Sequence, residues 1–347
     1  MESTKRYAEM VSVGAYLPEK TVTPHSFASP SDLPRSLDFD RLTAILAHHE
    51  VSEEQGSFEL AIEAAKKAIS RAQIELDSID LVLNASVSKM NHELSQHLSP
   101  SYASLIAENL GINNAQSFDV SNACAGMVTA LMIAESRIKS GQANYALIVS
   151  GEHITPIIDE AKRRNLYLNP RAIPSLTVGD GAAAYILGPT EQEGRIKFSE
   201  PFTLAQHNLL CIGQACKNHR GPRMRTKARE LQNSVMINLG TFLQRSMNKM
   251  GVKWEQIDHT YAHPTTPKAV KKGGRIATEA LGEIKFLHNE SVETANTAST
   301  THGVLLEISL ENKYLTADET VLLISFGSGV AIVAIHFNLP EGVENWS

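Results

Sequence analysis

The chain has 347 residues, 42% of them hydrophobic and 20% charged, which is enough to bury a large core in one domain or two. Its 32 basic and 38 acidic residues give a formal net charge of −6, which argues against a broad nucleic-acid-binding surface. No apolar run approaches the roughly 20 residues of a membrane-spanning helix, and the N-terminus lacks the apolar core of a signal peptide. We therefore expect a soluble cytoplasmic protein.

Strands and helices alternate along the first half of the chain. Helices are predicted where apolar residues recur at helical spacing, as at Leu60, Ala64 and Ala68. The predicted strands are 10–16, 79–87, 117–120, 145–150 and 182–187, and the predicted helices are 57–72, 102–110 and 124–139.

The second half repeats this order of elements. The predicted helices are 228–250, 268–281 and 302–311, and the predicted strands are 259–262, 321–325 and 330–337. We expect Gly273-Gly274 to break the second of these helices, and we expect 23–38 and 207–225 to be covering loops. The alternation implies a layered α/β architecture built from two halves, 1–190 and 191–347.

The chain contains three cysteines, Cys124, Cys211 and Cys216. Such a small odd number does not suggest a disulfide framework. Cys211 and Cys216 have no second ligand pair near them in the sequence, so we read them as ordinary thiols and predict no metal.

Cys124 is the candidate nucleophile. The strand 117–120 feeds a tight turn, and the turn opens a helix at Cys124. A thiol at a helix N-terminus meets the positive end of the helix dipole, which should lower its pKa. Its small neighbours Ala123, Ala125 and Gly126 leave room for a substrate. The alternative is a small buried apolar residue, which most free cysteines are.

Two later residues favour the chemical interpretation. His263 follows the strand 259–262, and Asn296 lies in a small-residue turn before a helix. Alone, each is more often structural, the histidine as a polar strand end and the asparagine as a turn former. Together with Cys124, they form a plausible group for acyl chemistry.

These segments resemble β-ketoacyl-[acyl-carrier-protein] synthase III along nearly the whole chain. The matching blocks occur in the family's order. They are Phe118-Asp119-Val120 with Cys124-Ala125-Gly126, Gly179-Asp180-Gly181, His263, Asn296-Thr297-Ala298-Ser299, and Phe326-Gly327-Ser328-Gly329.

The resemblance implies a five-layered αβαβα thiolase fold, a homodimer, and a thiolase-like half on each side of residue 190. It implies that Cys124 accepts an acyl group, while His263 and Asn296 stabilise the enolate of a malonyl-type thioester. The backbone N–H groups of Cys124 and Ser328 would form the oxyanion hole of acyl transfer. Ser328 replaces the family's usual glycine, so a left-handed φ angle at this position would be unfavourable for it.

The chain departs from the family at three places. The family's N-terminal tryptophan, which stacks on the adenine of CoA, is missing. Ser99 aligns with a phenylalanine that in many relatives closes the acyl pocket across the dimer, so a wider acyl pocket is expected. Pro264-Thr265-Thr266-Pro267 replaces the usual Gln-Ala-Asn after the histidine.

Lys268 and Arg275 belong to a basic helix in an acidic protein. Such a run is usually a solvated face, but these two residues align with those that dock acyl carrier protein in the family. We expect substrates carried on the phosphopantetheine of acyl carrier protein or CoA, and no other cofactor.

The leading hypothesis is therefore an acyltransferase that makes a carbon–carbon bond by decarboxylative Claisen condensation, in fatty-acid-like or polyketide and secondary-metabolite biosynthesis. The second substrate would be a malonyl- or β-ketoacyl-type thioester. The alternatives are plain acyl transfer to an oxygen, nitrogen or sulfur acceptor, and a non-catalytic partner subunit. A thiolase proper would carry a second cysteine near Gly327, which this chain lacks.

Overall fold

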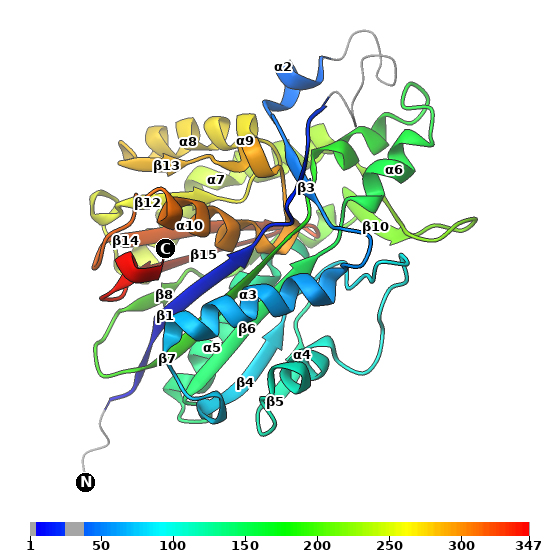
Figure 1. Ribbon diagram of the computed structural model, residues 1–347. Coiled ribbons are helices and arrows are strands. Elements are labelled where there is room, and N and C mark those ends of the chain that lie inside the picture. The colour runs from blue at the N-terminus through cyan, green and yellow to red at the C-terminus, as the bar shows by residue number, and fades with distance from the viewer. Residues whose placement is uncertain (1–4, 25–37, 347) are drawn as a thin grey trace.

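The fold is organised around two similar β-sheets (Figure 1). The computed structural model describes residues 5–24 and 38–346. The first sheet has the order β1-β7-β6-β4-β5. Its strands are β1 (Tyr7–Tyr16), β7 (Gly181–Thr190), β6 (Tyr145–Glu152), β4 (Ile79–Asn84) and β5 (Gln116–Asp119).

The second sheet repeats this plan. Its order is β13-β12-β14-β15-β8, and β9 (Phe202–Thr203) also pairs with β15. Its strands are β13 (Phe286–His288), β12 (His259–Ala262), β14 (Thr320–Gly327), β15 (Ala331–Asn338) and β8 (Ile196–Phe198). In each sheet three neighbouring strands run parallel and the other two pairings are antiparallel. The two halves therefore share one topology.

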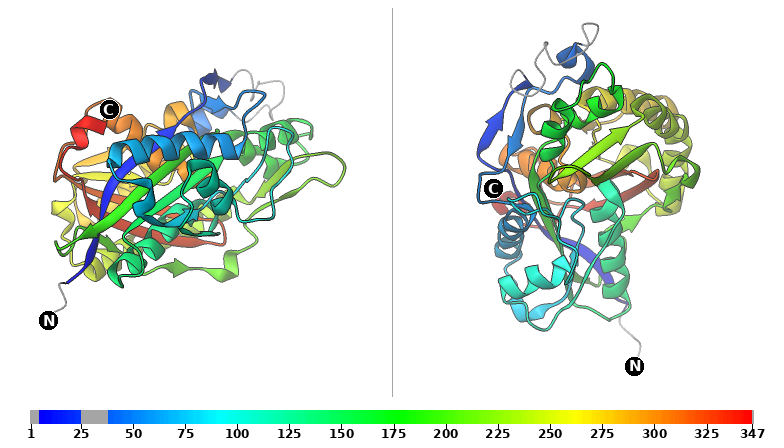
Figure 2. Two further views of the ribbon diagram at one scale, coloured as in Figure 1. Left: turned by 60° about the horizontal axis from the view of Figure 1, so that its bottom comes forward. Right: turned by 90° about the vertical axis from the view of Figure 1, so that its right-hand side faces the viewer.

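Helices form the remaining layers (Figures 1 and 2). Helices α3 (Ser57–Ala72) and α4 (Tyr102–Leu110) share an apolar cluster with the outer face of the first sheet. Helices α5 (Gly126–Lys139) and α10 (Thr301–Glu311) contribute to the central cluster, which contains strand residues of both sheets. Helices α7 (Ala228–Met250) and α8 (Pro267–Leu281) cover the outer face of the second sheet. The predicted five-layered thiolase-type α/β fold is confirmed.

Shorter elements surround one edge of these layers. They are β2 (Lys20–Val22), α2 (Phe39–Thr43), β3 (His48–Glu50), α6 (Pro156–Lys162) and α9 (Ser291–Thr294). A two-stranded hairpin, β10 (Cys211–Ala215) with β11 (Pro222–Thr226), projects from the body of the molecule. Among the described helices, none combines the length and apolar character needed to cross a membrane.

Two expectations from the sequence were wrong. Helix α8 continues through Gly273 and Gly274, because packing against α7 and β13 outweighs the low helix propensity of glycine. The stretch 207–225 is largely the β10–β11 hairpin rather than an irregular loop. The other loop expected, 23–38, lies almost wholly outside the described residues.

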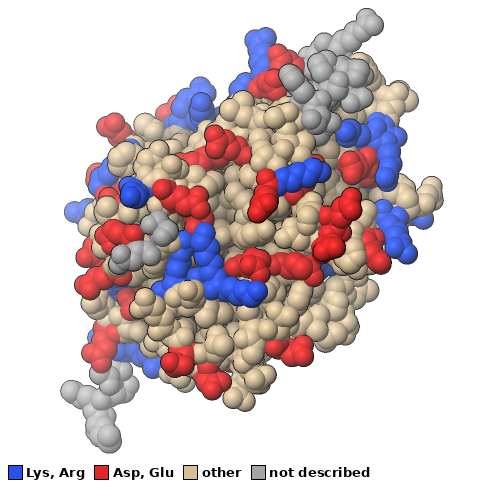
Figure 3. Space-filling view, in the orientation of Figure 1, with Lys and Arg blue, Asp and Glu red and all other residues tan. Residues whose placement is uncertain are grey.

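Charged side chains of both signs are interspersed over the face shown in Figure 3. This agrees with the small negative net charge of −6. The visible face offers no continuous basic surface of the kind that nucleic-acid binding needs.

Candidate active site

Cys124 lies at a strained junction between β5 and α5. A short 3-10 turn, Ala123–Ala125, connects the strand to the helix, so the thiol precedes the α-helix proper. Ala123 has a left-handed φ of 46°, which costs free energy for a residue with a Cβ. Asp119 anchors the strand end by accepting the backbone N–H groups of Tyr102 and Ala103.

The pKa of Cys124 contradicts the expectation of an activated thiol. Desolvation by burial raises the pKa of Cys124 to about 12, and the nearby thiol of Cys211 and carboxyl of Glu152 add to the rise. Backbone N–H groups at the turn are too weak to offset this desolvation. Desolvation therefore favours the thiol of Cys124 over the thiolate in the free protein.

His263 follows β12 directly, where its backbone N–H donates to the carbonyl of Ile324 at 2.8 Å. The side chain is buried, and burial lowers its pKa to about 4, so the ring is neutral near pH 7. Its Nδ1 has no hydrogen-bond partner among the described residues. No neighbour therefore fixes the tautomer of the ring.

Asn296 is held by the glycine-rich segment that the sequence singled out. Its backbone N–H donates to the carbonyl of Thr177 at 3.0 Å, and its carbonyl accepts the N–H of Gly179 at 3.1 Å. A Cβ on Gly179 would lie 2.4 Å from the carbonyl oxygen of Thr294, so this close approach requires glycine. The side-chain oxygen of Asn296 accepts the N–H of Ala298, which leaves its NH₂ group as the available donor.

Ser328 lies in the turn between β14 and β15, against the segment that carries Cys124. A Cβ on Gly327 would lie 2.7 Å from the carbonyl oxygen of Asn122, and the hydroxyl of Ser325 donates to the carbonyl of Cys124 at 3.2 Å. Ser328 has a negative φ, whereas Gly329 takes a left-handed φ of 122°. Serine therefore fits this turn without backbone strain.

One cavity of about 1290 Å³ brings the candidate residues together. Cys124, His263, Asn296 and Ser328 all line it, as do Lys268 and Arg275. Within the described residues its basic lining is Arg220, Arg223, Arg229, Lys268, Lys272 and Arg275, and no Asp or Glu contributes. Such a cavity suits a ligand with a negative charge outside and a reactive group inside.

The sequence of this chain is similar to those of known proteins. A family model for 3-oxoacyl-[acyl-carrier-protein (ACP)] synthase III matches residues 118–201. The β-ketoacyl-[acyl-carrier-protein] synthase III of Wolbachia pipientis is 25% identical over 332 residues, covering 94% of this chain and 98% of that protein. The corresponding protein of Aliarcobacter butzleri is 28% identical over 341 residues, covering 93% and 95%.

Solved structures share the fold of this chain. The priming β-ketosynthase of the R1128 polyketide biosynthetic pathway has a TM-score of 0.83 at 20% identity, covering 98% of this chain and 99% of that one. Xanthomonas campestris OleA, solved with bound lauric acid and lauroyl-CoA, has a TM-score of 0.81 at 21% identity, covering 95% and 98%. The chain is therefore similar to β-ketoacyl-[acyl-carrier-protein] synthase III over most of its length, and it shares the fold of these ketosynthases.

One residue predicted to shape the acyl pocket lies apart from the cavity. Ser99 is exposed and does not border the cavity in the described chain. Its proposed place in an acyl pocket depends on a second subunit and stays a prediction. Glu93, the nearest acid to that point, is exposed and pairs with Arg220 at 3.8 Å.

The N-terminal departure from the family is visible at α2. Phe39, Leu42 and Thr43 of this helix line the cavity in the segment where the synthase III family has its adenine-stacking tryptophan. Leu42 is 52% exposed there. An aliphatic side chain offers apolar contact but no aromatic face.

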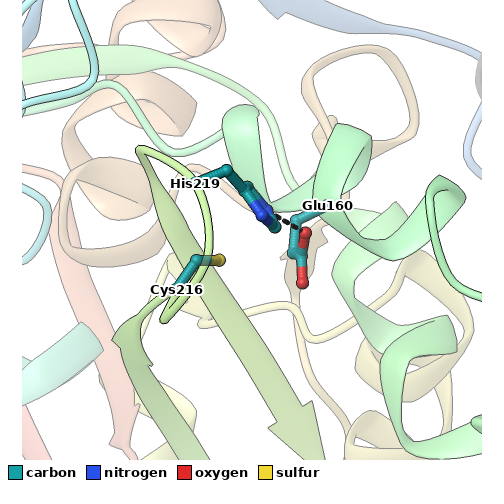
Figure 4. Close-up of side chains that lie close together, drawn as sticks. All are labelled: Glu160, Cys216 and His219. Atoms are coloured by element: carbon teal, nitrogen blue, oxygen red, sulfur yellow. Dashed lines mark hydrogen bonds and ion pairs between the residues drawn. The ribbon is translucent and has the colours of Figure 1, made fainter.

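A cluster of possible metal ligands lies on the β10–β11 hairpin and α6 (Figure 4). Glu160, Cys216 and His219 place oxygen, sulfur and nitrogen within 4.8 Å of one another, a donor set that zinc accepts. Nε2 of His219 lies 2.5 Å from Glu160, and Arg164 also binds this carboxylate. From the sequence, Cys216 was considered with Cys211, and His219, three residues further along the chain, was overlooked. Glu160 could not be linked to them from the sequence, because α6 lies beside the hairpin only in the folded chain.

Two buried side chains, Glu152 and His302, were also not singled out from the sequence. Glu152, at the end of β6, accepts hydrogen bonds from Ser88 and Ser299, and burial raises its pKa. His302 packs edge-on against His263 with 6.1 Å between ring centroids, and neither of its nitrogens has a partner within the described chain. A polar residue at the end of a buried strand was the only signal for Glu152.

Proposed function

We propose that the enzyme catalyses decarboxylative Claisen condensation, with Cys124 carrying the acyl group. The observation that supports this most is that Cys124, His263 and Asn296, from three separate segments, border a single cavity. A cysteine nucleophile, a neutral imidazole and an amide donor are the groups that both half-reactions need.

The first half-reaction acylates Cys124. His263 is neutral and accepts the thiol proton as the sulfur attacks the carbonyl carbon of the donor thioester. The backbone N–H groups of Cys124 and Ser328 stabilise the tetrahedral oxyanion. The carbon–sulfur bond to the donor breaks, and the departing thiolate takes the proton back from His263, which becomes neutral again.

The second half-reaction forms the carbon–carbon bond. The malonyl-type carboxylate leaves as carbon dioxide, and its bonding electrons form an enolate on the remaining thioester. The NH₂ group of Asn296 and an N–H of His263 donate to the enolate oxygen. The enolate carbon attacks the acyl carbonyl, the carbon–sulfur bond to Cys124 breaks, and the released thiolate takes up a proton from water to restore the thiol. Since Nδ1 of His263 has no partner among the described residues, the ring can accept a proton in one step and donate a hydrogen bond in the next.

The basic mouth supports a phosphopantetheine-borne substrate, on acyl carrier protein or CoA. Lys268 and Arg275 lie at this mouth, where the absence of acidic lining within the described residues favours an acidic carrier. We further propose a homodimer and no cofactor beyond the substrate's own phosphopantetheine. The pathway would be fatty-acid-like or polyketide and secondary-metabolite biosynthesis; one structural neighbour is named as part of a polyketide pathway.

The test is intact-protein mass spectrometry with a panel of acyl-CoA and acyl-carrier donors, followed by addition of malonyl- and β-ketoacyl-carrier substrates. We expect an acyl adduct that Cys124→Ala abolishes and Cys211→Ala, a change of another thiol on the same cavity, retains. An adduct that survives in Cys124→Ala would contradict the proposal. Acylation followed by transfer to an oxygen, nitrogen or sulfur acceptor, without a new carbon–carbon bond, would favour plain acyl transfer.

A further inference from the structure

The cavity has an apolar arm that the mechanism above does not use. This arm, called here the α7–α8 arm, lies between α7, α8 and the outer face of the second sheet. It is lined by Val235, Leu239, Val270, Gly273, Ala277 and Leu287. We infer that the α7–α8 arm receives the alkyl chain of a medium- or long-chain acyl thioester.

The arm is continuous with the reactive groups. Thr260 and Ala262 lie on β12 just before His263, and Ile324 lies beside Ala262 on β14; all three line the same cavity. The residues of α8 that line the cavity span Lys268 to Ala277, on the order of 13 Å along the helix axis. The basic lining residues of α8 are exposed, whereas Val270 and Ala277 are buried on the side that faces the second sheet. A chain that starts near His263 can therefore extend beneath α8 without leaving the protein.

The chemistry of the walls selects an alkyl chain over a phosphopantetheine arm. Phosphopantetheine carries amide groups, and burying an amide without partners costs free energy. Among the buried residues of this part of the wall, Thr260 carries a polar side chain, and its hydroxyl has no partner within the described chain. The polar and basic residues stand at the mouth instead. The carrier arm therefore belongs at the mouth, and the apolar end of the substrate belongs beneath α8.

The two glycines of α8 leave room for this arm. Glycine inside a helix lowers stability relative to alanine. Gly274 packs closely on β13, since a Cβ there would lie 2.4 Å from Cδ2 of Leu287 and that side chain would have to move. Gly273 is not required in this way, because a Cβ there would lie 3.5 Å from Leu239, an ordinary contact. A residue larger than glycine at position 273 would narrow the cavity. An empty apolar cavity lowers the stability of a protein, so this space is more consistent with a site that a ligand fills.

The inference rests on the proposed function, in which Cys124 carries the acyl group. It differs from the expectation for Ser99, which places the acyl chain in a pocket completed by a second subunit. The α7–α8 arm lies within one subunit. A larger side chain in the α7–α8 arm and a larger side chain at Ser99 should therefore change the preference for acyl-chain length independently of each other.

The decisive variant is Ala277→Leu, which fills the arm from α8. Its matched control is Thr278→Leu, the same new side chain at the next, exposed position of the helix. Acylation rates with acetyl, octanoyl and dodecanoyl thioesters are measured by intact-protein mass spectrometry. We expect Ala277→Leu to lower the dodecanoyl rate at least about tenfold and to leave the acetyl rate unchanged. Thr278→Leu should match the parent, and unfolding temperatures confirm that both variants fold.

A second measurement tests the arm without chemistry. Dodecanoate binding to the Cys124→Ala protein is followed by calorimetry, and adding Ala277→Leu should weaken it at least about tenfold, while Thr278→Leu does not. Unchanged dodecanoate binding and an unchanged ratio of dodecanoyl to acetyl rates in Ala277→Leu would overturn the inference. A shift in chain-length preference for Ser99→Phe alone would place the chain at the subunit interface. If no thioester acylates Cys124 but Ala277→Leu still weakens dodecanoate binding, the proposed function is refuted. The inference that the α7–α8 arm binds an alkyl chain is then retained.

Discussion

The side-chain oxygen of Asn296 accepts a hydrogen bond from the backbone N–H of Ala298 at 2.9 Å. Ala298 has a left-handed φ of 53°, and Ala295 on the other side has a φ of 56°. Strain on both sides of one amide indicates that the surrounding structure holds this side chain in a set orientation. The orientation commits the amide oxygen to the protein and leaves the NH₂ group for a ligand.

This geometry predicts a selective defect for Asn296→Asp. Aspartate keeps the oxygen that Ala298 binds but lacks the NH₂ donor. We expect near-normal acylation of Cys124 and a loss of carbon–carbon bond formation on the order of 10²–10³ in rate. Acylation is followed by mass spectrometry and product by chromatography, with Asn296→Ala as the comparison. An equal fall in both half-reactions would mean that Asn296 only supports the fold.

Gly327 should tolerate no side chain. A Cβ there meets the carbonyl oxygen of Asn122 at 2.7 Å, so the turn that bears Ser328 must move away from Cys124. We expect Gly327→Ala to lower the free energy of unfolding by roughly 1–3 kcal/mol and to slow acylation. Gly213→Ala is the control, because a Cβ on Gly213 meets nothing within 4 Å. Wild-type acylation in Gly327→Ala would show that the position of this turn is unimportant.

Buried histidines predict loss of stability on acidification. Burial lowers the pKa of His263 to about 4 and that of His302 to about 3, below their ordinary value of 6.5. The unfolded chain therefore binds protons first as the pH falls, and stability declines from about pH 6.5 toward pH 4. We expect His302→Leu to reduce this decline, measured as unfolding temperature from pH 7 to pH 4.5. An identical decline in the variant would mean that His302 does not contribute to the pH dependence.

The basic mouth predicts a carrier-specific defect. The double variant Lys268→Glu, Arg275→Glu should lose activity with carrier-bound substrate, most clearly at low salt. It should keep acylation by an N-acetylcysteamine thioester, which lacks the carrier. Lys253→Glu is the control, because Lys253 is exposed, precedes β12 in the chain and is not among the residues that line the cavity. Equal activity of the double variant and the parent with the carrier substrate would rule out this docking surface.

Local patterns in the sequence were sufficient for much of the fold. The helices α3, α4 and α7 have the bounds that apolar spacing predicted, because each buries one regular apolar face against a sheet. The β10–β11 hairpin was missed, because its strands are short, contain glycine and proline, and are only partly buried. Residues such as Cys124, His263 and Asn296 could be selected from the sequence because each follows a strand at the edge where such sheets bind ligands.

The sequence alone therefore determined the order of the elements, the layered α/β class and the candidate residues, since these depend on local periodicity and on motif order. Only the tertiary structure decided the protonation states of the candidate catalytic side chains. The thiol of Cys124 has a raised pKa and the ring of His263 is neutral because both are desolvated, and desolvation depends on residues distant in the chain. The same holds for the cavity, whose basic mouth and α7–α8 arm exist only where α7, α8 and the second sheet meet.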